Sequence, residues 1–409
     1  MRPAWSPLLD GSLRDTAGAL AVDLARRVVA APERHAGPSL GHGAAGAALC
    51  LGHVGAAHGD DALIDGAAAL VERAVEQVSA AEPLAMTLGD GSIGIAWVIE
   101  HLQRELAWTE DDPNTTTDEA LVAHVSQAPW LPPWGLLDGL AGIGAYLVER
   151  LAAAPVRPLL ERVVLQLLEG AHDSRGLGAT WWTARAHVAP ALRERHAWGH
   201  YDLGVARGAP GVLALLGQIH TVGVARAEVR GLLVRGFDWL WAKRAPRHVP
   251  AYLGPGVATE PGPPGWAHGA LAVGAALLGA AEALGDPVRA SEVRAWLCAV
   301  AGDAPARVAD EVGDDASLAR GSAGLGHVCQ RLYHATGDAV FADRGRHYLA
   351  HAIEHATQRT WPAPRAADAG LLSGVAGTAL ALSAASSPRP PTWDRALLLS
   401  PAAPAGPPA

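Results

Sequence analysis

A small glycine pair recurs seven times along this 409-residue chain, and each copy opens a run of apolar residues. Most copies read Gly-x-x-Gly, as in GLAGIGAYLVERL over residues 139–151. The pairs begin at Gly43, Gly91, Gly139, Gly208, Gly269, Gly321 and Gly374, with Ala272 in the second position of the fifth copy. Successive copies are 48, 48, 69, 61, 52 and 53 residues apart, enough for two helices and their connections. The repeat therefore predicts seven helical hairpins.

Apolar residues within each copy follow helical spacing, most clearly at Ile143, Tyr146, Leu147 and Leu151. Glycine in a helix costs about 0.5 to 1 kcal/mol relative to alanine, so its recurrence in the first turn needs a steric reason. We expect neighbouring helices to approach closely at that end. Seven inner helices backed by seven outer ones would then form an all-α fold, an α/α toroid. An open superhelix is the alternative, but its ends usually carry atypical repeats and the last copy here is regular.

The uninterrupted repeat predicts a single toroid domain over residues 1–385, although length alone would allow two or three domains. Residues 151–201 depart from the repeat and carry Trp181 and Trp182 beside several arginines. We expect this insertion to form a lid or a peptide-contact surface, with plain packing of the tryptophans as the alternative. Residues 386–409 are proline-rich and predict a disordered tail.

The net charge of −9, without a basic block, argues against nucleic acid as a partner. The first thirty residues are too charged for a signal peptide, and the longest strongly apolar stretch, residues 270–281, is too short to span a bilayer. Three cysteines give no disulfide framework, and Cys50 and Cys329 are expected to be buried, inert thiols. These features predict a soluble cytoplasmic protein that does not engage a membrane.

The residue before each first glycine is polar or charged in all seven copies. If equivalent positions lie around one rim, they are His42, Asp90, Asp138, Arg207, His268, Arg320 and Ser373. Helix N-termini facing that rim would add positive potential to the arginines, which predicts an anion site. The alternative is that Asp90 or Asp138 pairs with Arg207 or Arg320 in a purely structural way.

The repeat phrases also point to a family. GLLDGLAGIGAYL, YDLGVARGAPGVLALL, GWAHGALAVGAALL, LARGSAGLGHV and LLSGVAGTALAL, in this order, resemble the lanthionine synthetase C-like family over residues 35–385. The resemblance implies an α/α toroid. It also implies relatives that use zinc to activate cysteine thiols of a ribosomally made precursor peptide. Those thiols add to dehydroalanine or dehydrobutyrine and close thioether rings.

The three zinc ligands of that family are absent from the matching positions. Ala267 and Ala319 stand where two cysteines are expected, and Arg320 stands where a histidine is expected. Methyl groups offer no lone pair, and a guanidinium does not lose its proton to bind a metal. We therefore expect no metal and no cofactor, with a zinc site rebuilt from other histidines, such as His268 or His327, as the alternative.

Three other family positions differ as well. The histidine before the fourth glycine pair, to which the resemblance gives a proton-transfer role, is Arg207. The acid four residues before the third pair is Gly135, and the arginine before the fifth-copy tryptophan is Pro263.

The first functional hypothesis is a zinc-independent thioether cyclase of a modified peptide. His268, in the family's tyrosine position, would be the general acid or base, and Asp138 would orient it or exchange protons. Arg207 and Arg320 would stabilise the enolate or bind the peptide. Substrate contacts are expected from His42, Asp90, Trp181 and Trp182. The implied partners are a precursor peptide and a dehydratase, kinase or lyase of the same pathway.

Two further hypotheses come from other classes. The chain is alternatively a catalytically inactive pseudoenzyme that holds a precursor peptide or a partner modifying enzyme. The third hypothesis is another toroid enzyme, one that acts on sugars through paired carboxylates such as Asp90 and Asp138.

Overall fold

The computed structural model describes residues 5–30, 37–80, 84–108, 112–131, 133–173, 176, 178–303, 305, 307–358 and 369–402. The chain divides into two compact units, and neither is continuous in sequence. Unit 1 comprises Met1–Asp111, Pro264–Trp266 and Ala301–Asp394, and unit 2 comprises Asp112–Pro263, Ala267–Val300 and Arg395–Ala409. This division leaves the one-domain organisation expected for residues 1–385 as a prediction.

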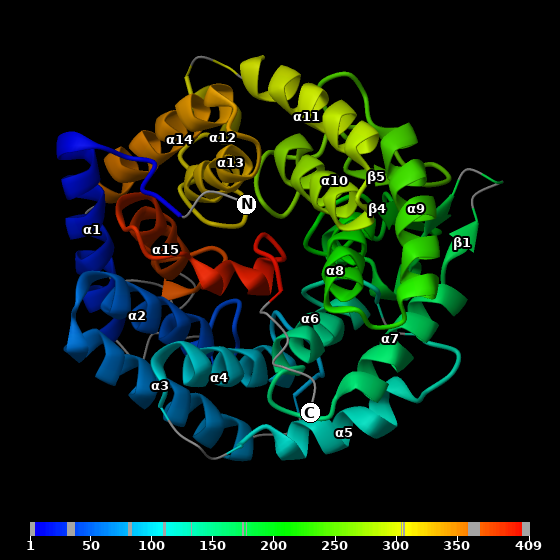
Figure 1. Ribbon diagram of the computed structural model, residues 1–409, viewed down its shortest axis with the longest axis horizontal. Helices are drawn as coiled ribbons and strands as arrows, with labels where there is room; N and C mark the ends of the chain where they lie inside the picture. The colour runs from blue at the N-terminus through cyan, green and yellow to red at the C-terminus, as the bar shows by residue number, and fades with distance from the viewer. Residues whose placement is uncertain are drawn as a thin grey trace. The chain divides into compact units, whose positions relative to one another are not determined.

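Each of the seven repeated first glycines is the N-cap of a largely buried helix, as the repeat predicts. These inner helices are α2 (Ala44–His58), α4 (Ser92–Leu106), α6 (Leu140–Arg150), α8 (Ala209–Val222), α10 (Ala270–Leu284), α13 (Ser322–Thr336) and α15 (Val375–Ser386). In unit 1, α15 contacts both α2 and α13, and α2 contacts α4. In unit 2, α8 lies between α6 and α10 (Figure 1).

The second glycine has a steric cause that differs from the expected one in five copies, those of Gly46, Gly94, Gly211, Gly324 and Gly377. A Cβ on Gly324 would lie 1.8 Å from the carbonyl oxygen of Leu318, six residues earlier, and the same clash recurs at 2.0 Å between Gly377 and Leu371. The adjacent copy comes second, with Leu318 Cβ 2.6 Å from the Cβ position of Gly377. The tightest restriction therefore comes from the loop that folds over each helix's own first turn, and only the weaker one from a neighbouring copy.

The outer helices are α1 (Gly11–Val29), α3 (Asp61–Ala80), α5 (Thr115–Val125), α7 (Arg157–Glu169), α9 (Arg226–Lys243), α11 (Pro287–Gly302) and α14 (Ala339–Gln358); α12 (Ala309–Val312) is a single turn. Consecutive inner and outer helices pack as hairpins, for example α2 with α3 and α8 with α9. The last inner helix, α15, has α1 as its partner, so this hairpin joins two ends of the sequence (Figure 1).

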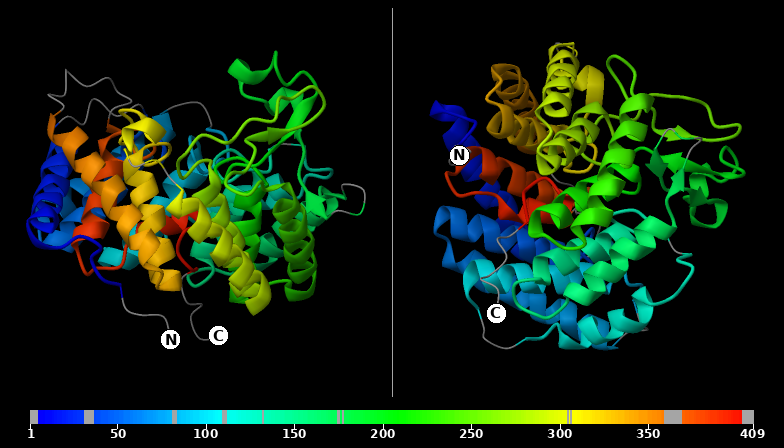
Figure 2. Two further views of the ribbon diagram at one scale, coloured as in Figure 1. Left: turned by 90° about the horizontal axis from the view of Figure 1, so that it is seen from above. Right: turned by 45° about the vertical axis from the view of Figure 1, so that its right-hand side comes forward.

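The segment expected to be an insertion contains a regular outer helix, because α7 continues to Glu169. The departure from the repeat comes after it, as β1 (His172–Asp173), β2 (Ala179–Thr180), β3 (Thr183–Ala184), η2 (Arg185–His187), η3 (Pro190–Leu192) and β4 (Gly199–Asp202). Strand β4 pairs antiparallel with β3 and with β5 (Tyr252–Leu253). This part projects from the helices of its own unit (Figure 2).

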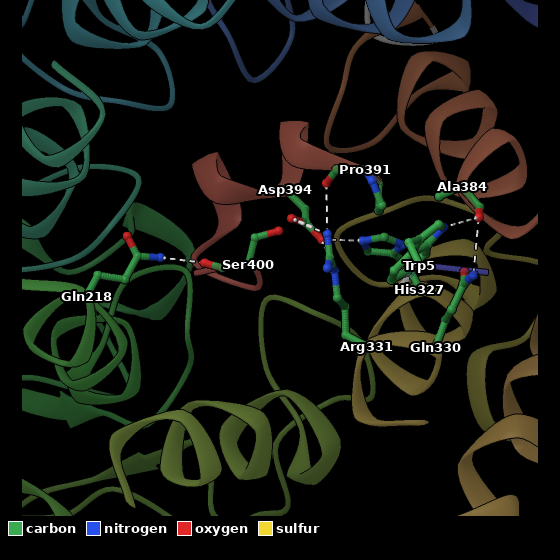
Figure 3. Close-up of polar contacts among 9 residues, drawn as sticks. All are labelled: Trp5, Gln218, His327, Gln330, Arg331, Ala384, Pro391, Asp394 and Ser400. Atoms are coloured by element: carbon green, nitrogen blue, oxygen red, sulfur yellow. Dashed lines mark hydrogen bonds and ion pairs between the residues drawn. The ribbon is translucent and has the colours of Figure 1, made fainter. Parts of the chain in front are cut away.

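The disordered tail expected for residues 386–409 is wrong for residues 386–402. Residues Thr392–Leu397 form η5, and the side chains of Trp393 and Asp394 are fully buried. Asp394 accepts hydrogen bonds from Arg331, and its Oδ2 lies 2.6 Å from Nε2 of His327 (Figure 3). Prolines end helix α15, but burial of the apolar residues after them still stabilises the folded chain. Residues 403–409 lie outside the described part of the chain.

Candidate functional site

Backbone hydrogen bonds join the loops that precede the inner helices, always two residues before the first glycine. In unit 1, Gly41 N–H donates to Gly89, Leu372 to Gly41 and Ala319 to Leu372, over 2.7, 3.0 and 2.8 Å. In unit 2, Leu137 donates to Ala206 over 2.9 Å and Ala206 donates to Ala267 over 3.3 Å. The next residue of each loop is the expected rim position. In unit 1, Asp90, His42, Ser373 and Arg320 therefore lie along one edge. In unit 2, Asp138, Arg207 and His268 lie along one edge in the same way.

The rim arginine and the rim acid of unit 2 form an ion pair. Arg207 Nη1 donates to Asp138 Oδ2 over 2.9 Å, with the side chains 48% and 25% exposed. The other carboxylate oxygen of Asp138 is buried without a hydrogen-bond partner among the described residues. Burial raises the pKa of Asp138, and nearby Asp202 adds to that effect, while Arg207 opposes it. Asp138 thus holds its proton more readily than an ordinary aspartate.

The backbone of Arg207 also explains the missing acid at position 135. A Cβ on Gly135 would lie 2.5 Å from Arg207 Cα and 2.5 Å from Asp138 Oδ1. Any side chain at position 135 would have to displace that loop. The acid that the family resemblance places there is therefore incompatible with this local packing.

A second acid, Asp202, lies beside the rim histidine of the same unit. Nε2 of His268 is 3.4 Å from Oδ1 of Asp202, and their side chains are 13% and 6% exposed. This is an ion-pair distance without hydrogen-bond alignment, since Nε2 is buried and unpartnered among the described residues. Asp202 Oδ1 also accepts a hydrogen bond of 2.7 Å from Gly204 N–H. The carboxylate is therefore fixed by its own loop and aimed at the imidazole.

Strand pairing gathers further titratable groups around Asp202. His200 and Asp202 are two residues apart on β4 and so face the same side, and Tyr252 is the partner of Asp202 on β5. His200 Nε2 lies 4.0 Å from Asp202 Oδ2, and His200 Nδ1 lies 2.7 Å from Nδ1 of His196. Burial lowers the pKa of His200 to about 4 and also lowers that of His196. Both imidazoles are therefore neutral near pH 7.

Arg320, the rim arginine of unit 1, is exposed, and its side chain makes no hydrogen bond or ion pair with a described residue. It lines a cavity of about 480 Å³. The cavity wall also contains Asp314, Ser317, His355 and Ser373. Arg320 therefore offers a guanidinium to a ligand, which suits the anion-binding role expected for it.

The two tryptophans expected to contact substrate are engaged in packing. Trp181 is 3% exposed, and its Nε1 donates to the carbonyl of Leu167. Trp182 is half-buried with its ring edge-on to Tyr201. The geometry favours the packing alternative for both residues. Trp198 of the same segment is 74% exposed.

The zinc-ligand positions do not fit the metal. Ala267 and Ala319 use their backbone in the loop-to-loop hydrogen bonds and present only methyl groups, and Arg320 presents a guanidinium. In the part of the chain that the structure describes, no three or more His, Cys, Asp or Glu side chains are grouped to hold a metal ion. Cys50 and Cys329 are buried, and burial raises the pKa of both thiols, as expected for inert cysteines.

Asp202, His200 and Tyr252 were missed by the sequence reasoning. The available signal was Asp202-Leu-Gly204 ahead of the fourth glycine pair, because an Asp two residues before a Gly often accepts the backbone N–H in a turn. His200 and Tyr252 had no such signal, since their strands are too short to show alternation.

The fold class follows from a solved structure. Nisin cyclase superposes with a TM-score of 0.75 and 18% sequence identity, over 92% of this chain and 97% of that chain. This likeness confirms the expected all-α, α/α toroid class of fold. The model of the lanthionine synthetase C-like protein family matches residues 35–398, and the chain belongs to that family. Among curated proteins, none matches the sequence. None of the described helices is long and apolar enough to cross a membrane.

Proposed function

We propose that this protein is a zinc-independent cyclase that adds cysteine thiols of a ribosomally made precursor peptide to dehydroamino acids. Family membership and the likeness to nisin cyclase support a role of the lanthipeptide cyclase type. The observation that carries the zinc-independent form is His268, which stands beside Asp202 where general acid–base chemistry is possible without a metal. A cysteine thiol needs only about two pKa units of help to react near neutrality.

The reaction is a net addition of S–H across a carbon–carbon double bond. His268 removes the thiol proton, and the thiolate sulfur forms a bond to the β-carbon of dehydroalanine or dehydrobutyrine. The π electrons move to give an enolate, whose negative charge Arg207 stabilises, while Arg320 would bind the peptide on unit 1. The imidazolium of His268 returns the proton to the α-carbon, and Asp138 orients Arg207 through their ion pair. His42 and Asp90 would contact the peptide along the edge of unit 1.

Ring closure needs a peptide that already carries a dehydroamino acid. The partners that this role requires are therefore the precursor peptide and an enzyme that dehydrates its serine or threonine. A dehydratase, or a kinase acting together with a lyase, supplies that chemistry.

The experiment incubates the full-length protein with a synthetic peptide that contains one dehydroalanine and one cysteine. Thiol alkylation followed by mass spectrometry counts the cysteines that closed rings. Ring closure by the protein, lost in His268→Gln and kept in the exposed control His248→Gln, would support the proposal. Equal closure with His268→Gln would reject His268 as the acid–base group.

A pseudoenzyme that binds the same peptide is the second candidate. The observation that favours it is the Asp138–Arg207 ion pair, since both groups are already occupied by each other. This candidate predicts saturable binding of the dehydrated peptide, measured by fluorescence anisotropy, with no ring closure above the rate without protein.

A further inference from the structure

We propose that Asp202 is a positioning residue that holds the Nε2–H of His268 and leaves Nδ1 of the same ring to take the thiol proton. The inference deepens the proposed function and rests on it for the identity of the thiol substrate. The geometry between Asp202 and His268 does not depend on that function.

Asp202 is held in place by backbone pairing, by a hydrogen bond and by burial. Its backbone pairs with Tyr252 across strands β4 and β5, its Oδ1 accepts the N–H of Gly204, and its side chain is 6% exposed. A carboxylate held in this way has little freedom to turn away. Its remaining hydrogen-bonding capacity faces the two histidines on either side of it.

The imidazole of His268 is placed by a glycine. A Cβ on Gly204 would lie 2.5 Å from Nε2 and 2.6 Å from Cδ2 of His268, so the ring fits only because position 204 has no side chain. His268 itself precedes Gly269, whose φ of 97° is in the region that favours glycine. The backbone at both ends of the contact is therefore specialised for this approach.

The two ring nitrogens of His268 differ in their surroundings. Nε2 is fully buried, 3.4 Å from Asp202 Oδ1, and without a hydrogen bond among the described residues. A small rotation of the ring would align a proton on Nε2 with that oxygen. Nδ1 is not buried in this way, and no described residue forms a hydrogen bond with it. A proton on Nε2 therefore satisfies the buried nitrogen and leaves the lone pair of Nδ1 available.

Neither His200 nor Arg207 neutralises the negative charge of Asp202, so this charge remains available to pair with His268. His200 faces Oδ2 at 4.0 Å, but burial lowers its pKa to about 4, so it is uncharged near pH 7. Arg207 donates to Asp138 and forms no hydrogen bond or ion pair with Asp202. When Nδ1 of His268 accepts the thiol proton, the imidazolium charge develops beside a fixed carboxylate, as in the histidine–aspartate pair of serine hydrolases. The proton later returns to the substrate α-carbon, so the ring ends in its starting form.

The tautomer of His268 tests the inference without any substrate. Full-length protein labelled with 15N in its imidazole rings is examined by long-range 1H–15N correlation at pH 8, and His268→Gln assigns the signal. We expect the Nε2–H tautomer in the unmodified protein. Asp202→Leu removes both carboxylate oxygens and keeps a branched side chain, whereas an amide would keep an oxygen at the Oδ1 position, which faces both Gly204 N–H and Nε2. The Nε2–H form then loses its acceptor and the proton should move to Nδ1, whereas the matched control Asp238→Leu should leave the Nε2–H pattern intact.

An Nδ1–H tautomer in the unmodified protein overturns the inference, and this reading stands even if Asp202→Leu fails to fold. An unchanged Nε2–H signal in folded Asp202→Leu overturns it as well. The catalytic readout is separate: ring closure should fall by about 100-fold or more in Asp202→Leu. A tautomer that switches as expected in a protein that closes no rings would keep the Asp202–His268 relationship and reject the proposed function.

Discussion

The Nε atom of Arg331 lies 2.5 Å from Oδ2 of Asp394, and the Asp394 side chain is fully buried. Oδ1 of Asp394 accepts a second bond of 2.9 Å from Arg331 Nη2, and the carbonyl of Pro391 accepts from the same nitrogen (Figure 3). His327 stacks on Trp393 and faces the same carboxylate. The segment after α15 is thus attached to α13 through the buried carboxylate of Asp394, which contacts both Arg331 and His327.

The first prediction concerns this attachment. Arg331→Met should lower the free energy of unfolding by about 3 kcal/mol, because it removes the guanidinium that donates two hydrogen bonds to the buried Asp394 carboxylate. Urea unfolding followed by circular dichroism measures the change. The matched control is Arg27→Met, which removes an exposed partner of Asp23 and should have little effect. Equal effects of the two substitutions would contradict the attachment.

The second prediction concerns Arg207 and Asp138. Their side chains are partly exposed, so Arg207→Met should cost only about 1 kcal/mol of stability. The double variant Arg207→Met with Asp138→Asn should recover most of that loss, because no unpaired carboxylate remains. Thermal unfolding of the four proteins in the cycle gives the coupling. A loss of about 4 kcal/mol in Arg207→Met would instead identify a purely structural pair.

The third prediction is a pH dependence from His200. Its folded pKa of about 4 is below the unfolded value of about 6.5, so the unfolded chain binds the extra proton between these pH values. Stability from this group is complete above pH 6.5 and is lost as the pH falls toward 4, by about 3 kcal/mol at most. Urea unfolding at pH 7 and pH 4.5 should show a smaller decrease in His200→Gln than in the unmodified protein. An identical decrease would mean that His200 does not titrate in this way.

The fourth prediction uses two glycines with opposite surroundings. Gly204→Ala should displace the His268 ring and cost about 1 to 3 kcal/mol, together with most of the ring-closing activity. Gly279→Ala, in helix α10, meets nothing within 4 Å and should be neutral or stabilising by up to about 1 kcal/mol. Thermal unfolding measures both. If Gly204→Ala left both stability and ring closure unchanged, the His268 ring would not need the space beside position 204.

The helical repeat could be predicted because each inner helix begins at its glycine, as with Gly139 and α6. The local cause could not, since the clash of Gly324 with Leu318 depends on how the preceding loop folds back. Adjacency of Asp138, Arg207 and His268 followed from equivalence in the repeat. Asp202 lies outside the repeated positions, so only the pairing of β4 with β5 reveals it.

The proline content of the C-terminal segment led to a wrong prediction of disorder there. Proline content correctly predicts where α15 ends, but it says nothing about whether the residues beyond pack against the core. Trp393 is 2% exposed and Leu397 is 1% exposed, and such apolar burial offsets the lost helical hydrogen bonds. The tryptophan pair shows the same limit, because sequence spacing does not tell a packing ring from an exposed one.

The central claim is ring closure without zinc, and the most direct measurement is its rate after exhaustive chelation. The full-length protein is dialysed against a strong zinc chelator, its zinc content is checked by elemental analysis, and the dehydroalanine–cysteine peptide is then added. The account predicts less than about one zinc per ten chains and an unchanged rate, because Ala267, Ala319 and Arg320 offer no ligand. A rate that is lost on chelation and restored by one equivalent of zinc would contradict it.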